Sequence, residues 1–328
     1  MANYLIINTG GTIGMVEGPH GLTPNAGEVE NALQQHTELT DWHQHQLNWE
    51  HWSPLLDSSD LNPSHWYRIT HTIAQAENID GVLVIHGTDT LAYTASALSF
   101  LLADLTIPVV ITGSMLPISA TGTDALDNLQ RALIALESNR PEVMVAVGEE
   151  VLPGSRVTKY STQAMASFSC PGWDASHWAN SKKVSTRRFT QPWRNPEVTL
   201  LTLYPGIPET QLDRISDNPA TRAILISSYG NGNAANTAAL RRMLASAQHR
   251  AIPVFVTSQC FEGNVDFGLY AASSVFTEHG AISCGMMPLE AAITKIQILC
   301  SEFDHADDII QVFREPLARE WENQPDAH

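Results

Sequence analysis

Short runs of apolar residues alternate with amphipathic segments along most of this chain. The clearest runs, Tyr4–Asn8 and Gly81–His86, are rich in branched aliphatic side chains and are too short for buried helices. Segments with apolar residues at helical spacing follow such runs after short turns. This alternation predicts an α/β fold in which a mostly parallel sheet is covered by helices on both faces.

Two parts of the chain show this alternation, and a polar, basic stretch with two prolines separates them. In the first part we expect strands at Pro108–Thr112 and Glu142–Val147, and helices at Asn25–Leu39, Pro63–Glu77 and Leu91–Leu102. A further helix is expected to follow Asp124 and to end at about Leu136. In the second part we expect strands at Val198–Leu203, Arg222–Ser227 and Pro253–Thr257, and helices at Asn236–Ala247, Leu269–His279, Pro288–Cys300 and Ala306–Arg314. The pattern predicts a larger N-terminal α/β domain with a parallel or mixed sheet (1–182), a linker (183–197) and a smaller C-terminal α/β domain (198–328).

Polar residues gather where the strands of the first part end. Thr9-Gly-Gly-Thr12, Gly87-Thr-Asp-Thr90 and Gly113-Ser114 each follow an apolar strand, and Asp57-Ser-Ser-Asp60 follows an apolar pair. Open α/β sheets bind their ligands at the carboxyl ends of their strands, so these clusters predict a binding site.

Each cluster also has a structural interpretation. Thr12 could cap a tight turn, and Ser59 or Asp60 could cap the helix that Asn62-Pro63 opens. A helix cap accounts for Asp89 or Thr90, but it does not account for three polar side chains in a row.

Thr12 and Lys159 offer the most reactive chemistry. The two glycines before Thr12 let the backbone approach a ligand closely. A threonine hydroxyl is a weak nucleophile until a neighbouring group activates it. Lys159 lies in a polar stretch, where it could carry a proton or anchor a charge, and lysine is scarce in this sequence. An ordinary exposed lysine is the alternative.

The composition limits the partners and the compartment. The chain has 18 Lys and Arg against 35 Asp and Glu, a net charge of −17, so nucleic acids and anionic membranes are not expected partners. Its four cysteines show no metal-ligand spacing, and we expect them to be reduced, buried thiols of a cytosolic protein. The N-terminus does not read as a secretory signal, no apolar run is long enough to span a membrane, and no metal motif is present. His43 and His45 are interpreted as packing or surface residues.

The segment Val16–Pro24 is rich in glycine and proline. We expect it to have no regular structure and to act as a mobile lid beside Thr12.

Several of these motifs together resemble the bacterial-type L-asparaginase family. The most specific are Thr9-Gly-Gly-Thr-Ile-Gly14, His86-Gly-Thr-Asp-Thr90 and Thr158-Lys159. Asp57-Ser-Ser-Asp60, Tyr204-Pro-Gly206, Ser228–Asn233 and Gln259-Cys260 are most similar to its cytoplasmic type I branch. The resemblance implies hydrolysis of L-asparagine to L-aspartate and ammonia without a cofactor or metal. It also implies an intimate homodimer, often paired into a dimer of dimers.

The resemblance also implies the catalytic roles. Thr12 matches the family's nucleophile, which forms an acyl-enzyme ester. Thr88, Asp89 and Lys159 match a second group, in which the lysine and the aspartate polarise Thr88 and the water that releases the product.

Substrate contacts are implied in the same way. Asp57, Ser58 and Ser59 match the segment that holds the α-carboxylate of the substrate. Thr88 and Asp89 belong to the same pocket, with the Asp89 carboxylate facing the α-amino group. Ser114 matches a position whose backbone carbonyl contacts the side-chain amide.

One position departs from the family. The lid usually carries a tyrosine that helps to activate the first threonine, and that position here is Leu22. His20, Thr23 or a tyrosine from elsewhere could replace it. The departure keeps two alternatives open: a related amidase with another amide substrate, and a non-catalytic amino-acid sensor.

Some cytoplasmic members bind asparagine at an effector site between subunits. Thr158 and Cys260 match positions compatible with such a site. The alternative for Cys260 is a small buried thiol in the second domain.

Overall fold

A six-stranded sheet with the order β4-β1-β5-β6-β7-β8 organises the N-terminal part of the chain. Its strands are β1 (Asn3–Gly10), β4 (Gln46–Leu56), β5 (Gly81–Ile85), β6 (Val109–Thr112), β7 (Val143–Ala146) and β8 (Val151–Pro153). Neighbouring strands are parallel from β4 to β7, and β8 is antiparallel to β7. Every residue of β5, β6 and β7 is buried, which explains their continuous apolar sequences.

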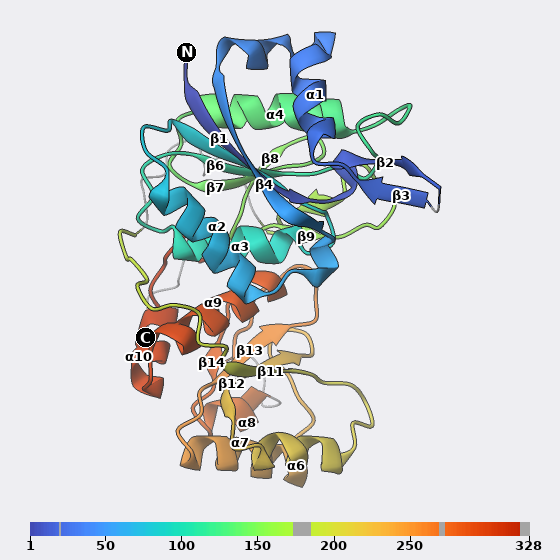
Figure 1. The fold of residues 1–328 in the computed structure, drawn as a ribbon. Helices are drawn as coiled ribbons and strands as arrows, with labels where there is room; N and C mark the ends of the chain where they lie inside the picture. Colours follow the sequence, from blue (N-terminus) through green and yellow to red (C-terminus); the bar gives the residue numbers. More distant parts are fainter. Residues whose placement is uncertain (20, 173–184, 269–272, 322–328) are drawn as a thin grey trace. The chain divides into compact units, whose positions relative to one another are not determined.

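Helices cover both faces of this sheet. Figure 1 shows α1 (Gly27–Gln35) and α4 (Ala125–Glu137) on one face, and α2 (Pro63–Gln75) and α3 (Leu91–Leu101) on the other. Every residue of α3 except Tyr93 is buried. The predicted α/β class is therefore confirmed.

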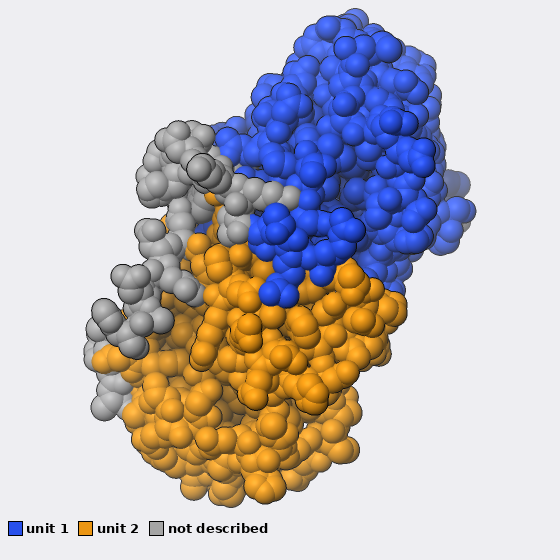
Figure 2. Space-filling view, turned by 90° about the vertical axis from the view of Figure 1, so that its left-hand side faces the viewer, with its two compact units in different colours: residues 1–170, 182–188 blue, residues 171–181, 189–328 orange. Residues whose placement is uncertain are grey.

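The chain divides into two compact units, coloured separately in Figure 2. Unit 1 comprises residues 1–170 and 182–188, and unit 2 comprises residues 171–181 and 189–328. The computed structural model describes residues 1–19, 21–172, 185–268 and 273–321. The start of the expected linker, 183–184, lies outside the described residues, and 185–196 contain no helix or strand. The assignment of the catalytic role to one domain stays a prediction.

A second parallel sheet, with the order β11-β12-β13-β14, forms the centre of unit 2. Its strands are β11 (Glu197–Thr202), β12 (Thr221–Ser228), β13 (Val254–Ser258) and β14 (Ile282–Ser283). The helices are α6 (Glu209–Asp217), α7 (Ala238–His249), α8 (Ser274–Thr277), α9 (Leu289–Glu302) and α10 (Ala306–Phe313). An aliphatic core that includes Ile226, Met243 and Val256 fills the space between this sheet and α7.

Two predicted helices in unit 1 have different ends in the structure. The helix expected at Asn25–Leu39 ends at Gln35, because the backbone of His36 is extended, and a 3-10 helix, η2 (Thr37–Gln44), follows. The cap of α2 is Asn62 rather than Ser59 or Asp60. The Asn62 side chain accepts from the backbone of Ser64, and the His65 side chain accepts from the backbone of Asn62, which completes a capping box.

The lid segment was predicted wrongly as irregular. It forms an antiparallel hairpin of β2 (Met15–Gly18) and β3 (Gly21–Pro24), in which Val16 lies opposite Thr23. Backbone pairing needs no buried face, and the two β-branched residues favour extended backbone. Gly21 has a φ of 112°, a conformation that glycine adopts at little cost at the tight connection. Its mobility stays a prediction.

In unit 2, α6 and β14 were not predicted, and only part of the helix expected at Leu269–His279 can be compared. Residues 269–272 of that helix lie outside the described residues, and α8 covers Ser274–Thr277. The sequence of α6 is mostly polar, and of its described residues only Leu212 and Ile215 pack against the core, which is too short an apolar stripe to predict a helix.

The cysteines are all free, but they are not all buried as expected. Cys284 and Cys300 are buried, Cys170 is half-buried, and Cys260 is exposed. Cys260 follows β13 in a turn rather than within a core element, so its interpretation as a buried thiol was wrong. Among the described residues, no helix is both long and apolar enough to cross a membrane.

Candidate active site

Two glycines let the end of β1 approach the ends of both neighbouring strands, Gly10 against Leu56 of β4 and Gly11 against Gly87 after β5. Gly10 and Gly11 have φ values of 123° and 100°, which disfavour any side chain. A β-carbon on Gly11 would lie 2.5 Å from the Gly87 nitrogen, so only glycine fits this approach. As a result, Thr12, at the start of the 3-10 helix η1 (Thr12–Gly14), lies beside the turn that carries Thr88.

A cavity of about 190 Å³ opens at these strand ends. Six of the predicted site residues line it: Thr12, Asp57, Ser58, Thr88, Asp89 and Lys159. At roughly 30 Å³ per water, the volume corresponds to about six water molecules, which suits a small polar substrate.

Lys159 connects the second threonine to a carboxylate. It lies in β9 (Thr158–Lys159), which pairs antiparallel with β10 (Phe168–Ser169). Its Nζ donates to Thr88 Oγ1 at 2.8 Å and to Asp89 Oδ1 at 2.7 Å. The lysine side chain is 14% exposed, whereas the aspartate side chain is 70% exposed. The ammonium is therefore fixed at the cavity wall with one neutral and one charged partner.

The Asp57 cluster is held by local hydrogen bonds. Asp57 Oδ1 accepts from the backbone nitrogen of Ser59 at 2.8 Å and from its hydroxyl at 2.7 Å. These hydrogen bonds hold the pKa of Asp57 below its ordinary value. The Thr90 hydroxyl donates to the Ser58 carbonyl at 2.6 Å and ties this segment to the β5 turn. Ser59 is exposed and is not among the residues that line the cavity.

His86, in the second signature, is a buried structural residue. Its Nδ1 lies 2.6 Å from the Gly87 carbonyl, and its Nε2 lies 2.9 Å from Thr94 Oγ1. A carbonyl only accepts, so Nδ1 carries the proton and the Thr94 hydroxyl donates to Nε2. Trp66 Nε1 donates to the same hydroxyl at 3.1 Å. Burial lowers the pKa of His86 to about 4, and the imidazole is therefore neutral near pH 7.

Five cavity residues were not predicted as site residues: the glycines Gly11 and Gly87, and Met15, Met115 and Thr162. Met115 follows Ser114 at the end of β6, and Thr162 follows Lys159 in a polar stretch, so both lie beside predicted positions. Ser114 itself is buried, its hydroxyl donates to the Leu116 carbonyl, and it does not line the cavity.

The lid candidates lie on the exposed hairpin. Leu22 and Thr23 belong to β3 and do not line the cavity, and the Thr23 hydroxyl donates weakly to the Val16 carbonyl at 3.4 Å. His20 lies outside the described residues. Within the described chain, no hydrogen bond to the Thr12 hydroxyl is found.

The two residues of the hypothetical effector site belong to different units. Thr158 is half-buried in β9 of unit 1, and Cys260 is exposed in unit 2. Their common role stays a prediction.

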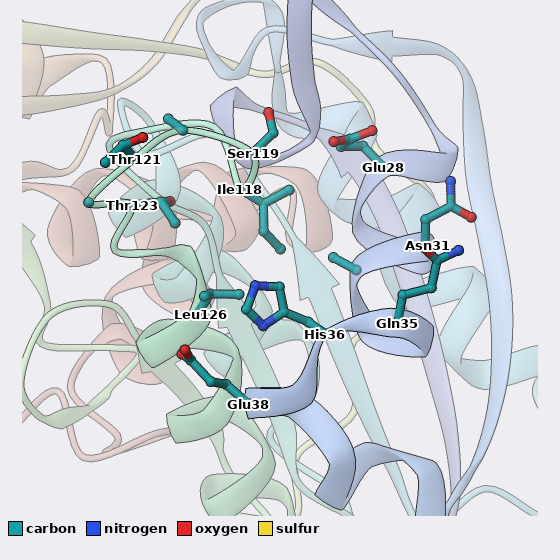
Figure 3. Close-up of a pocket in the computed structure, with 13 residues that line it drawn as sticks. Glu28, Asn31, Gln35, His36, Glu38, Ile118, Ser119, Thr121, Thr123 and Leu126 are labelled. Atoms are coloured by element: carbon teal, nitrogen blue, oxygen red, sulfur yellow. The ribbon is translucent and has the colours of Figure 1, made fainter.

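A second, larger hollow of about 750 Å³ lies between α1 and the segment that leads into α4 (Figure 3). Glu28 and Gln35 line one side, Ser119 and Thr121 line the other, and His36 lies near its base. None of the predicted catalytic residues lines it, so the smaller cavity is the candidate active site. The described residues contain no cluster of His, Cys, Asp or Glu side chains able to hold a metal ion.

Comparison with known proteins agrees with this fold. Residues 3–191 match the family model of the asparaginase N-terminal domain, and residues 197–313 match the glutaminase/asparaginase C-terminal domain. Together, the fold and the cavity define a two-domain α/β enzyme. The chain belongs to the asparaginase family.

The relatives found include asparaginases from distant organisms. L-asparaginase 1 of Escherichia coli K12 is 33% identical over 90% of both chains. The L-asparaginase of Thermococcus kodakarensis is 31% identical over 81% of this chain and 83% of its own. Among solved structures, L-asparaginase I of Vibrio cholerae superposes with a TM-score of 0.86 at 30% identity, over 98% of this chain and 99% of the other.

Proposed function

We propose that this protein hydrolyses the side-chain amide of L-asparagine to L-aspartate and ammonia through an ester on Thr12. The proposal rests on one observation above the others. Lys159 Nζ lies within hydrogen-bond distance of both Thr88 Oγ1 and Asp89 Oδ1, at the cavity that Thr12 also lines. Membership of the asparaginase family and the relatives called L-asparaginase support the same reaction.

Thr12 supplies the nucleophile in this proposal. Its Oγ attacks the side-chain carbonyl carbon, the carbon–nitrogen bond breaks, and the nitrogen leaves as ammonia after it accepts a proton. Thr88, polarised by Lys159 and Asp89, then directs a water molecule to the ester. Hydrolysis of the ester releases aspartate and restores the Thr12 hydroxyl.

The polar wall of the cavity supplies the contacts for an amino acid. Ser58 and its neighbours in the Asp57–Ser59 segment would face the α-carboxylate, with the Ser58 hydroxyl as a donor. The Asp89 carboxylate would face the α-ammonium.

The activation of Thr12 differs from the usual family pattern. Leu22 cannot relay a proton, so the activating group comes from another residue of the hairpin, from unit 2 or from a partner subunit. In this proposal the hairpin closes over bound substrate, and Leu22 supplies apolar cover that excludes water.

The proposal extends to assembly and location. The protein acts as a homodimer or a dimer of dimers in the cytoplasm, with the catalytic groups in the N-terminal domain and without a cofactor. The family membership and the type I motifs support this part of the proposal.

The decisive test is ammonia release from a panel of L-asparagine, L-glutamine and their D-forms. Release from L-asparagine in preference to the others is the expected result. Release only from another amide would favour the related amidase. Binding of an amino acid by calorimetry without any ammonia release would favour the sensor.

A further inference from the structure

Two hydroxyl groups converge on the sulfur of Met115. Thr88 Oγ1 and Ser167 Oγ each donate to Met115 Sδ at 3.7 Å. Ser167 is completely buried, whereas Met115 and Thr88 line the candidate active site. Sulfur is a weak acceptor, yet it is the partner of the Thr88 hydroxyl hydrogen in this structure.

The backbone of Met115 is held firmly. Its nitrogen donates to both carboxylate oxygens of Asp124 at 3.0 Å, and Asn128 Nδ2 donates to the same carboxylate at 3.0 Å. Asn128 Nδ2 also donates to the Gly113 carbonyl at 2.9 Å. A methionine side chain has three rotatable bonds and adapts easily to its surroundings. Here a buried carboxylate fixes its backbone and two hydroxyls fix its sulfur.

The hydrogen-bonding capacity of Thr88 shows what the contact with the Met115 sulfur does. Its hydroxyl has one hydrogen and two lone pairs. One lone pair accepts from Lys159 Nζ at 2.8 Å, and the hydrogen is directed to Met115 Sδ. The second lone pair is then left to face the cavity, where a water or a leaving group would lie. Without an acceptor at Met115, the hydrogen is free to turn and occupy that direction.

We propose that Met115 is a positioning residue, whose thioether sets the direction of the Thr88 hydroxyl hydrogen for hydrolysis. Met115 does not exchange a proton with the substrate in this proposal. It acts through Thr88, and the inference therefore rests on the role given to Thr88 under the proposed function.

Four substitutions at three methionines test the proposal by measuring kcat and KM for ammonia release from L-asparagine, together with the unfolding midpoint. Met115→Leu keeps the apolar volume but removes the acceptor. Met115→Gln restores an acceptor, the amide oxygen, on a chain of similar length. Met15→Leu makes the same change at another wall of the cavity. Met144→Leu makes it at a buried position of β7 outside the cavity and serves as the matched control.

We expect Met115→Leu to lower kcat about five- to ten-fold, in line with the loss of one hydrogen bond. Its KM should stay within about two-fold, because binding groups other than Thr88 are untouched. Met115→Gln should recover at least half of the lost kcat, and Met144→Leu should match the parent chain. The unfolding midpoints of all variants should agree closely, which a purely packing role of Met115 would not require.

Three outcomes would overturn the inference. The first is an unchanged kcat in Met115→Leu while the parent chain is active, which leaves the proposed function intact. The second is an equal loss in Met115→Leu and Met15→Leu with no recovery in Met115→Gln, which shows a general need for apolar lining. The third is a parent chain that releases no ammonia, which removes the proposed function and this inference together.

Discussion

A single lysine connects the charged and the hydroxyl parts of the cavity, and whether this chain is an active enzyme depends on that one residue. Lys159 is the cation within hydrogen-bond distance of Thr88 and Asp89. When the ammonium at the end of a lysine side chain donates to two acceptors at once, the side chain is held in one orientation. The proposed relay therefore depends on both the charge and the reach of this residue.

Lys159→Met should lower kcat about 10²–10⁴-fold, because it removes the group that polarises Thr88. The matched control is Arg188→Met, which also replaces a cation by methionine and breaks an ion pair of 2.7 Å, with Asp104. We expect this control to retain most of its kcat. Comparable ammonia release by Lys159→Met and the parent chain would remove Lys159 from the mechanism.

Leu22 tests the proposed closure of the hairpin. It is 49% exposed on β3, opposite Glu17. If the hairpin closes over the substrate, Leu22→Tyr places a hydroxyl near Thr12 and should raise kcat for L-asparagine by about ten-fold or more. Leu22→Phe adds the ring without the hydroxyl and should not do so. Equal kcat values for the two variants would show that the activating group lies outside the hairpin.

At the scale of elements, the buried hydrogen-bond network at the end of β5 makes the free energy of unfolding depend on pH. Burial lowers the pKa of His86 to about 4 from 6.5, so between these values the unfolded chain binds a proton that the folded chain does not. The stability that depends on neutral His86 is complete above pH 6.5 and is lost as the pH falls towards 4. At pH 5 this loss is about 2 kcal/mol.

We therefore expect the free energy of unfolding to fall less between pH 7 and pH 5 in His86→Asn than in the parent chain, by about 2 kcal/mol. Asparagine keeps one donor and one acceptor at this position. His71→Gln changes an exposed histidine on α2 and should keep the slope of the parent chain. Denaturant unfolding at the two pH values measures the difference, and parallel slopes in all three proteins would contradict the neutral state of His86.

A buried ion pair ties α9 to the segment after α10 in unit 2. Lys295 and Glu320 have no exposed side-chain surface, and Lys295 Nζ also donates to the carbonyls of Phe313 and Glu315 at 2.8 Å. Lys295→Met leaves the Glu320 carboxylate buried without its cation and should cost about 3–5 kcal/mol of unfolding free energy. The double variant with Glu320→Gln should lose clearly less, and equal losses would contradict this account.

The strands that the sequence predicted in unit 1 are those with continuous apolar runs. β5 and β6 needed no tertiary information, because every one of their residues is buried. β4 was not predicted, because its half-buried residues mix tryptophan, histidine and charged side chains, and pairing with β1 alone makes it a strand. The hairpin was missed for the opposite reason, since its glycines and prolines concealed strands that bury little surface.

The site residues that directly follow predicted strands were predictable from the sequence. Thr12, Thr88 and Asp89 follow predicted strands, so topology alone brings them to one edge of the sheet. Met115 carries no reactive group, and its contribution depends on its contact with Thr88. Thr162 carries a hydroxyl but belongs to none of the strand-end clusters, so the sequence does not single it out.

At the scale of the whole molecule, the net charge of −17 and the family membership indicate an enzyme that acts on small molecules rather than on polyanions. The proposed homodimer can be measured directly by sedimentation at several ionic strengths. Because like charges repel in the assembled state, we expect association to strengthen as salt screens them. A monomer at all concentrations with full activity would contradict the proposal that the protein acts as a homodimer or a dimer of dimers.

The most direct test of the account is ammonia release from L-asparagine by three purified proteins: the parent chain, Thr12→Ala and Thr88→Ala. We predict release by the parent chain and a loss of at least about 10³-fold in kcat for each variant, with unchanged unfolding midpoints, since both hydroxyls line the cavity rather than the core. Release by Thr12→Ala at a rate near that of the parent chain would contradict the central claim that Thr12 is the nucleophile.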